Sequence, residues 1–507
     1  MTTRYITTPI FYLNGEPHLG HVYTTVAGDM LARYWRLAGA RVKFLTGTDE
    51  HGQKVAQAAE AADEGPQVYT NRMSALWLDM TRKINASQDV FLRTTEKRHH
   101  EAAQALWRKL EEAGQIYKSV YAGWYSVRDE AYYEESEIVD GLAPTGAPVE
   151  WMEETSYFFR LSAWERPLLD YYEANPQAIA PIGKRKEVLS FIKGGLRDLS
   201  ISRTKFTWGV TVPEDPEHVM YVWVEALVNY ITALGYPNVE GEEFQAFWPE
   251  VIHIIGKDII RFHAVYWPAL LLAAGLLPPN RIFAHGWWTH DGEKMSKSLG
   301  NVVDPFKLID TYGLDPVRYY LMREIPFGQD GDYSDESMIQ RVNSDLANDL
   351  GNLVQRVLSF IYKNAGAQIP KPDELLGEDR EMLAKAAHLH DLLRDDMEVQ
   401  ALQAYCQHIW EVVGEANRYV DSQKPWSLKK SLDPQDHRRM ETVLYVLAEV
   451  IRHVAIYVQP IMPEAASKIL DQMGQEERTF EALKSPLKPG TPIVEPQAVF
   501  PRVEKEK

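Results

Sequence analysis

In the first part of the chain, the spacing of hydrophobic and polar positions switches between that of a β-strand and that of an α-helix. Residues 4–13 are rich in β-branched and aromatic side chains and are followed by turn residues, which predicts a strand. Residues 21–37 have the apolar spacing of a helix, and the apolar run at 42–45 predicts the next strand. The same order returns later, with a strand expected over 252–255, a helix over 259–274 and a strand over 282–284. Strands that alternate with helices predict a parallel sheet covered on both faces.

Two long segments do not follow this alternation. Residues from 116 to about 211 are rich in Tyr, Trp, Glu and Gly, and we expect them to form an inserted domain. From about Ser334 onward the apolar spacing is helical and heptad-like, notably over 346–361, 402–420 and 440–461. This spacing predicts a helical bundle. The polar, Pro-rich tail after Pro486 is expected either to pack back on the bundle or to fray.

Composition and charge narrow the class of protein. A chain of 507 residues with 45% hydrophobic side chains suggests a globular protein of two or three domains. No apolar run approaches a membrane span and the N-terminus lacks a secretory core, so we expect a cytoplasmic protein without a membrane partner. The single cysteine, Cys406, excludes an intramolecular disulfide and a cysteine-based zinc cluster.

The balance of charge also limits the expected partners. The chain has 54 basic and 72 acidic side chains, a formal net charge of −18. Such an excess of acid argues against a nonspecific nucleic-acid binder. The excess of acidic side chains still allows a local row of basic side chains to bind an RNA through a few salt-sensitive contacts.

Two short segments carry the candidate chemistry. His18 and His21 stand at the start of the first predicted helix, where backbone N–H groups and the helix dipole favour a polyphosphate, and Gly20 leaves room for a flat base. Lys294 and Lys297 lie in a Gly-flanked loop that can neutralise a departing pyrophosphate. Each segment alone has an ordinary explanation, as a solvated or metal-binding histidine pair and as a surface loop. Together they indicate that a carboxylic acid is adenylated with ATP.

These two segments resemble the two motifs of the class I aminoacyl-tRNA synthetases, and further segments narrow the resemblance to the methionyl-tRNA synthetases. Those segments are Thr8–Gly15, Thr46–Lys54, Tyr221–Ala226, Gly256–Ile259 with Phe262–His263, Asn417–Asp421 and Lys424–Trp426. The resemblance implies a methionine–tRNA ligase, which forms methionyl-adenylate and pyrophosphate and then transfers methionine to the terminal adenosine of initiator and elongator tRNA(Met).

The resemblance also assigns the parts of the chain. It implies an α/β fold, with a Rossmann-like doubly wound parallel sheet split by a connective domain and followed by an α-helical anticodon-binding bundle. The expected ranges are 1–115 and 221–285 for the catalytic halves, 116–220 for the connective domain, 286–334 for a linking segment and 335–507 for the bundle and tail.

By the same resemblance, His18, His21, Lys294 and Lys297 are expected to be catalytic. Residues expected to bind ATP are Gly20, Arg203, Gly256, Asp258, Ser296 and Lys297. Asp49 and the backbone of Ile10 would hold the substrate ammonium, beside a methionine side-chain pocket formed by Tyr12, Trp223, Ala226, Leu227, Tyr230, Ile259, Phe262 and His263, with Trp267 one helical turn beyond. Asn352, Arg356 and Trp426 would read the anticodon.

Ordinary structural roles compete with several of these assignments. Aromatic side chains at helical spacing are more often core residues, and Asp49 and Asp258 can serve as a strand-end turn and a helix cap. Trp426 can simply pack a loop on the bundle, and Asn352 and Arg356 can form a solvated helix face.

The expected cofactor is Mg²⁺-bound ATP, used as a substrate, and no metal site is expected. Ser126 and Asp129 stand where many relatives have the first cysteine pair of a zinc knuckle, so no structural zinc is expected. The expected partners are L-methionine and tRNA(Met), and the expected state is a monomer. Two rival functions are a smaller nucleotidylyltransferase that shares the His-x-Gly-His turn, and a non-enzymatic RNA-binding paralogue that uses the bundle alone.

Overall fold

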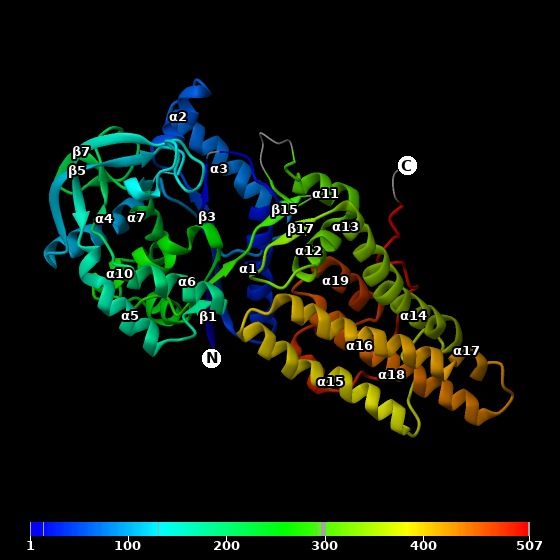
Figure 1. The fold of residues 1–507 in the computed structure, drawn as a ribbon. Coiled ribbons are helices and arrows are strands. Elements are labelled where there is room, and N and C mark those ends of the chain that lie inside the picture. Colours follow the sequence, from blue (N-terminus) through cyan, green and yellow to red (C-terminus); the bar gives the residue numbers. More distant parts are fainter. Residues whose placement is uncertain (1, 14, 130, 291, 296–300, 505–507) are drawn as a thin grey trace. The chain divides into compact units, whose positions relative to one another are not determined.

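The chain divides into two compact units in a computed structural model that describes residues 2–13, 15–129, 131–290, 292–295 and 301–504 (Figure 1). One unit comprises Met1–Thr2, His18–Arg41 and Gly286–Lys507, and is called the helical unit here. The other comprises Thr3–Pro17 and Val42–His285, and is called the sheet unit.

A seven-stranded sheet within the described residues forms the core of the sheet unit. Its strands run in the order β2-β3-β1-β13-β14-β8, with β4 also paired to β3. They are β1 (Thr3–Thr7), β2 (Phe11–Tyr12), β3 (Arg41–Asp49), β4 (Val90–Arg93), β8 (Ile179–Ala180), β13 (Val251–Gly256) and β14 (Arg281–His285). The described pairings in this sheet are parallel, which confirms the fold expected from the alternating pattern. Five of the six residues of β13 are buried, because helices cover it on both faces.

The helices of the sheet unit mostly precede or follow these strands. They are α2 (Gln53–Ala61), α3 (Pro66–Lys83), α4 (Lys97–Glu112), α5 (Glu165–Ala174), α6 (Ile182–Lys193), α7 (Val222–Leu227), α8 (Asn229–Thr232), α9 (Glu242–Phe247) and α10 (Trp267–Ala273). The single helix expected over 259–274 is interrupted, because a 3₁₀ turn at Lys257–Ile259 and a π-helix at Phe262–Tyr266 precede α10. Pro268 has no N–H to donate, and the Ala264 carbonyl instead accepts a hydrogen bond from the Tyr172 hydroxyl at 2.7 Å.

The expected insertion contains two small antiparallel sheets, and one of its strands belongs to the main parallel sheet. Strands β6 (Ala131–Tyr133), β5 (Ile116–Ser126), β7 (Glu150–Phe159) and β9 (Leu199–Ser200) pair in this order, and β10 (Ser202–Arg203), β12 (Asp215–Met220) and β11 (Thr211–Val212) form a smaller sheet. In the sequence between β7 and β9, strand β8 pairs with β14 at the edge of the parallel sheet. Part of the range 116–220 therefore belongs to the main sheet, and the limits of a connective domain stay a prediction.

The helical unit contains α1 and the C-terminal bundle. Its elements are α1 (Leu19–Leu37), β15 (Trp288–His290), β16 (Glu293–Lys294), β17 (Gly331–Tyr333), α11 (Pro305–Tyr312), α12 (Leu314–Arg323), α13 (Asp335–Arg341), a π-helix (Val342–Gly351), α14 (Asn352–Asn364), α15 (Gly377–Glu398), α16 (Leu402–Gln423), α17 (Pro425–Leu428), α18 (Pro434–Val458) and α19 (Pro463–Gln472). Helices α15, α16 and α18 lie side by side, which confirms the predicted bundle (Figure 1). Helix α1 packs on α12 within this unit.

The tail after Pro486 packs back on the bundle. Leu487, Ile493 and Phe500 are buried, and the Tyr445 hydroxyl donates to the Leu487 carbonyl at 2.9 Å. This outcome selects one of the two alternatives that the sequence left open.

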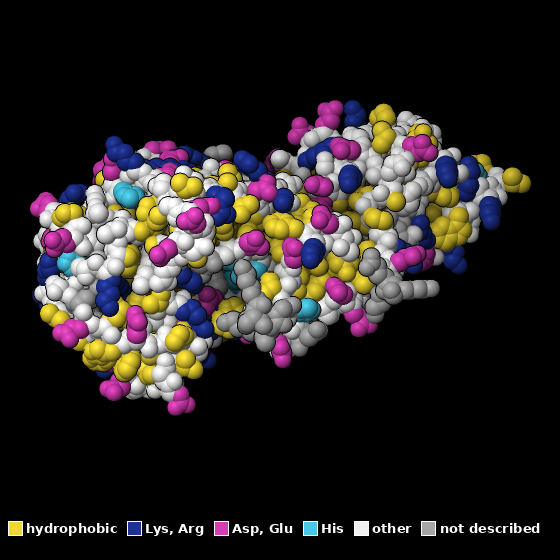
Figure 2. Space-filling model, turned by 90° about the horizontal axis from the view of Figure 1, so that it is seen from above, with side chains coloured by type: hydrophobic (Ala, Val, Ile, Leu, Met, Phe, Trp, Pro, Cys, Tyr) yellow, Lys and Arg dark blue, Asp and Glu magenta, His cyan; other side chains and the backbone are white. Residues whose placement is uncertain are grey.

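The surface carries charged and hydrophobic side chains, as the composition suggests. On the face shown in Figure 2, acidic and basic side chains are interspersed, with hydrophobic side chains between them. Among the described residues, no helix combines the length and the apolar character needed to cross a lipid bilayer.

Candidate active site and anticodon pocket

Several predicted residues follow the carboxyl ends of neighbouring parallel strands in the sheet unit. Asp49 ends β3 opposite Tyr12 of β2, and Ile10 lies in the loop between β1 and β2. Gly256 ends β13 and Asp258 follows in the 3₁₀ turn. A Cβ on Gly256 would lie 2.6 Å from Oδ1 of Asp258, so a larger residue there would displace the Asp258 carboxylate. Ligands of such sheets bind beyond this edge.

A set of aromatic side chains forms a wall in the same unit. The rings of Trp223 and Phe262 are stacked with their centroids 3.9 Å apart, and the His263 ring lies edge-on to Trp223 at 6.4 Å. The predicted residues Tyr12, Trp223, Leu227, Tyr230, Ile259 and Phe262 belong to or pack against one hydrophobic core. Ala226 lies on α7 beside Leu227, and both are buried. The structure therefore brings these predicted residues into one part of the sheet unit.

Tyr230 and His263 are joined by a hydrogen bond whose direction can be assigned. Nδ1 of His263 lies 3.0 Å from the Ile259 carbonyl, which can only accept, so Nδ1 carries the proton. Burial lowers the pKa of His263 to about 4, so the ring is neutral near pH 7 and Nε2 is unprotonated. Nε2 therefore accepts the hydrogen bond from the Tyr230 hydroxyl, at 2.7 Å.

His18 and His21 cap α1 in the helical unit. His18 is the N-cap residue, and its Nδ1 accepts a hydrogen bond from the Gly20 N–H at 3.1 Å. Nδ1 of His21 accepts from the His18 N–H at 3.2 Å, and the two rings lie 3.6 Å apart. Because both Nδ1 atoms accept, the proton of each neutral ring is on Nε2. Partial burial and the adjacent His18 lower the pKa of His21 well below its usual value.

The loop that carries the predicted lysines is described only in part. Lys294 ends β16, which pairs with β15. Ser296 and Lys297 lie outside the described residues. Their expected contacts with ATP stay predictions.

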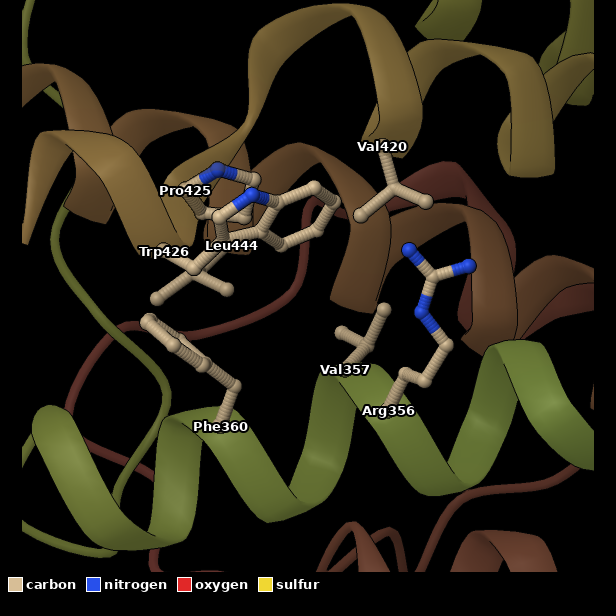
Figure 3. Close-up of a pocket in the computed structure, with 7 residues that line it drawn as sticks. All are labelled: Arg356, Val357, Phe360, Val420, Pro425, Trp426 and Leu444. Atoms are coloured by element: carbon tan, nitrogen blue, oxygen red, sulfur yellow. The ribbon is translucent and has the colours of Figure 1, made fainter.

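Arg356 and Trp426 line a cavity of about 130 Å³ in the helical bundle (Figure 3). Its other lining residues are Val357, Phe360, Val420, Pro425 and Leu444. The Arg356 guanidinium lies 5.4 Å from the Trp426 ring centroid and donates to Asp421 at 2.8 Å. Trp426 remains 37% exposed. Asn352 is exposed one helical turn before Arg356 and does not line this cavity.

Sequence and structure comparisons find similar proteins over nearly the whole chain. Residues 4–148 and 143–358 match the family described as "tRNA synthetases class I (M)", and residues 365–507 match "Anticodon binding domain of methionyl tRNA ligase". The chain belongs to the methionyl-tRNA synthetases. A "Methionine--tRNA ligase" of Rhizobium meliloti (strain 1021) is 55% identical and covers 98% of each chain. The solved structure of "Mycobacterium tuberculosis methionyl-tRNA synthetase in complex with methionyl-adenylate" is 52% identical with a TM-score of 0.97, covering 99% of this chain and 100% of that chain.

Within this methionyl-tRNA synthetase, Arg203 is enclosed by aromatic rings of the sheet unit. It is 2% exposed, and its guanidinium lies 4.4 Å from the Tyr221 ring centroid and 4.8 Å from that of Tyr132. It donates to the Ser202 carbonyl at 2.7 Å. These contacts hold the Arg203 side chain in place, and its role in ATP binding stays a prediction.

A buried carboxylate with two histidines was not predicted from the sequence. Oε1 of Glu225 lies 2.9 Å from Nδ1 of His51, and Oε2 lies 2.7 Å from Nε2 of His99. Burial alone would raise the pKa of Glu225, but His51 and His99 lower it below its usual value. Because Glu225 stands on α7 between Trp223 and Ala226, this cluster fixes the helix that carries part of the aromatic wall.

The position expected for a zinc knuckle in relatives holds a set of hydrogen bonds. Asp129 accepts hydrogen bonds from the hydroxyl of Tyr133, at 2.8 Å, and from that of Thr145. Its own N–H donates to Ser126. Within the described residues, no group of three or more His, Cys, Asp or Glu side chains is arranged to hold a metal ion.

Proposed function

We propose that this chain activates L-methionine with Mg²⁺-bound ATP and transfers the methionyl group to initiator and elongator tRNA(Met). The observation that carries the proposal is the aromatic wall with the neutral Tyr230–His263 pair, in a chain that matches an adenylate-bound methionyl-tRNA synthetase over its full length. An apolar, aromatic wall with a polar tip suits a thioether side chain. Asp49, at the end of β3, would pair with the substrate ammonium.

In the first step, the methionine carboxylate attacks the α-phosphorus of ATP, an oxygen–phosphorus bond forms, and pyrophosphate leaves. The carboxylate is already ionised, so the step requires no general base. His18 and His21 would donate from Nε2 to phosphate oxygens at the start of α1, where the helix dipole also favours anions. Lys294 and Lys297 would neutralise charge on the pyrophosphate, and Mg²⁺ would bind the phosphates as part of the substrate.

In the second step, a ribose hydroxyl of the terminal adenosine attacks the acyl carbonyl and releases AMP. The cavity beside Arg356 and Trp426 supports recognition of an anticodon base, because a base can stack on the indole while the guanidinium reads its edge. Asn352, one turn before Arg356, would contact a neighbouring base. A monomeric state and a cytoplasmic location complete the proposal.

The test is ATP–pyrophosphate exchange with each amino acid in turn, without tRNA. We expect exchange with methionine and weaker exchange with homocysteine, since an apolar pocket discriminates a methylene by only about 10- to 200-fold. Exchange with another amino acid instead would refute the pocket assignment. The absence of exchange with all amino acids would favour a non-enzymatic RNA-binding role, which binding of tRNA(Met) by the inactive protein would then support.

A further inference from the structure

The two residues that follow Asp49, the proposed ligand of the substrate ammonium, are tied by their side chains to other parts of the sheet unit. Glu50 and His51 are both buried. Nδ1 of His51 lies 2.9 Å from the carboxylate of Glu225 on α7. Glu50 is held by an arginine of the neighbouring strand β4. The chain is therefore fixed on the carboxyl side of Asp49.

The carboxylate of Glu50 forms a bidentate ion pair with Arg93, the last residue of β4. Nε of Arg93 lies 2.7 Å from Oε1 of Glu50, and Nη2 lies 2.9 Å from Oε2. The Thr48 hydroxyl also donates to Oε1, at 2.7 Å, and the Thr95 hydroxyl donates to Oε2, at 2.5 Å. A planar guanidinium that binds both oxygens of a carboxylate fixes its orientation as well as its distance.

The backbone of Glu50 is held by two further side chains. Its N–H donates to the Thr94 hydroxyl at 2.9 Å, and its carbonyl accepts a hydrogen bond from the indole N–H of Trp208 at 2.6 Å. The N–H of Glu50 belongs to the planar peptide group that begins at Cα of Asp49. Contacts that hold Glu50 therefore also hold the backbone from which the Asp49 carboxylate extends.

Arg93 is itself held at the end of its strand. It lies opposite Thr48 in the register of β3 and β4, and its Nη2 donates to Oδ1 of Asn71 on α3 at 2.7 Å. We propose that Arg93 is a positioning residue, which acts through Glu50 to direct the Asp49 carboxylate toward the substrate ammonium. This inference rests on the proposed function and adds to it a residue that does not itself contact the substrate.

The experiment compares two ligands that differ only in the ammonium group. L-Methioninol carries the ammonium, 4-(methylthio)butan-1-ol has hydrogen in its place, and neither has the carboxylate that attacks ATP. Their inhibition constants against methionine are measured by ATP–pyrophosphate exchange for the wild-type chain, Arg93→Met and Arg4→Met. Arg4→Met is the matched control, because Arg4 forms an ion pair with Glu250 at 3.1 Å near the amino end of β1, whereas Asp49 is at the carboxyl end of β3.

We expect Arg93→Met to raise the inhibition constant of L-methioninol by about five- to twentyfold, a part of the roughly ten- to hundredfold that a hydrogen bond to a charged group contributes. The constant of the ammonium-free alcohol should stay unchanged, as should both constants in Arg4→Met. Equal increases for the two ligands in Arg93→Met would indicate general damage to the site. That result, or an unchanged constant for L-methioninol, would overturn the inference.

A second variant tests whether Arg93 acts through Asp49. Asp49→Asn should also weaken the binding of L-methioninol, and adding Arg93→Met to it should cause no further loss. Equal losses from Arg93→Met in the two backgrounds would contradict the inference. If Arg93→Met does not fold, as judged by its thermal transition, the double variant Arg93→Met/Glu50→Gln also removes the buried charge and is measured in the same way.

The wild-type chain separates the two proposals. If it activates methionine and Arg93→Met binds both ligands normally, only the role of Arg93 is refuted. If it does not activate methionine, the proposed function and this inference are refuted together.

Discussion

At the scale of single residues, the space beside the His18 ring decides which residue can stand at position 20. A Cβ on Gly20 would lie 3.1 Å from Cε1 and 3.2 Å from Nδ1 of His18, closer than ordinary van der Waals contact. The imidazole would have to move, and its hydrogen bond with the Gly20 N–H would change. Glycine at this position therefore preserves the arrangement of the two histidines.

Gly20→Ala should lower the maximal rate of methionine-dependent ATP–pyrophosphate exchange by about two- to tenfold, because the His18 ring, which we propose contacts the phosphates, must shift slightly, and a shift of about 1 Å costs up to about 100-fold. The KM for methionine should change little, because methionine is expected to bind other residues. Gly183→Ala is a matched control, since Gly183 is also the second residue of a helix and a Cβ there meets no atom within 4 Å. Similar rates in both variants would contradict the expectation.

His263 should make the stability of the sheet unit depend on pH. Burial lowers its pKa from 6.5 to about 4, so between these pH values the unfolded chain binds a proton that the folded chain does not. The free energy of unfolding should therefore fall as pH falls from about 6.5 to about 4, by at most about 3 kcal/mol from this group. Urea midpoints at pH 7 and 5 measure the effect. His263→Gln should show a smaller change between the two, and equal changes would argue against a neutral, buried imidazole.

The sequence predicts single site residues better than it predicts their partners. His18, Asp49 and Trp223 stand in short segments whose residue types can be read directly. The partners of Glu225 are 174 and 126 residues away, at His51 and His99, and only the fold brings them together. The same limit applies to the indole N–H of Trp267, which has no hydrogen-bond partner among the described residues.

At the scale of elements, one buried ion pair connects α1 to α12. The Arg318 guanidinium donates to Asp29 at 2.6 Å, to the Ile461 carbonyl at 2.7 Å and to the Pro460 carbonyl at 3.0 Å. Asp29 and Arg318 are both fully buried. The helix α1, which His18 caps, is thereby fixed to the end of the bundle.

Arg318→Met should lower the free energy of unfolding of the helical unit by about 1 to 3 kcal/mol, because two carbonyls lose this donor while Asp29 keeps its ion pair with Arg33 at 2.7 Å. Urea unfolding followed by circular dichroism measures the change. Lys484→Met is the control, since the Lys484–Glu481 pair is mostly exposed, and it should change stability by less than about 1 kcal/mol. Equal midpoints for the two variants would show that the buried pair contributes little.

Elements were predictable where their periodicity is long and regular. The observed bundle helices and β13 agree closely with the elements predicted from apolar spacing. That spacing arises because each element buries one or both of its faces against neighbouring elements. β8 has only two residues, too few for a period, and was included in the expected insertion. The break before α10 depends on Pro268 and on the distant Tyr172 hydroxyl, which no local pattern indicates.

At the scale of the whole molecule, a substitution in the bundle should impair the transfer of methionine to tRNA without impairing the activation of methionine. Trp426→Ala should lower the kcat/KM of aminoacylation for tRNA(Met) by about ten- to hundredfold, the usual effect of losing one base–aromatic stack. ATP–pyrophosphate exchange without tRNA should remain at the wild-type rate. Leu432→Ala, at a side chain that is 99% exposed in the same part of the bundle, should leave both activities unchanged. A parallel loss of exchange in Trp426→Ala would indicate damage to the fold.

Because the chain passes several times between its two units, neither unit can be expressed as one continuous fragment. The chain passes between them after Thr2, Pro17, Arg41 and His285, so α1 belongs with helices that are encoded more than two hundred residues later. A fragment that starts at Gly286 would carry Arg318 into its core without the carboxylate of Asp29. Such a fragment should need residues 18–41 added back as a separate peptide, and recovery of its fold by that peptide would measure what the discontinuity contributes.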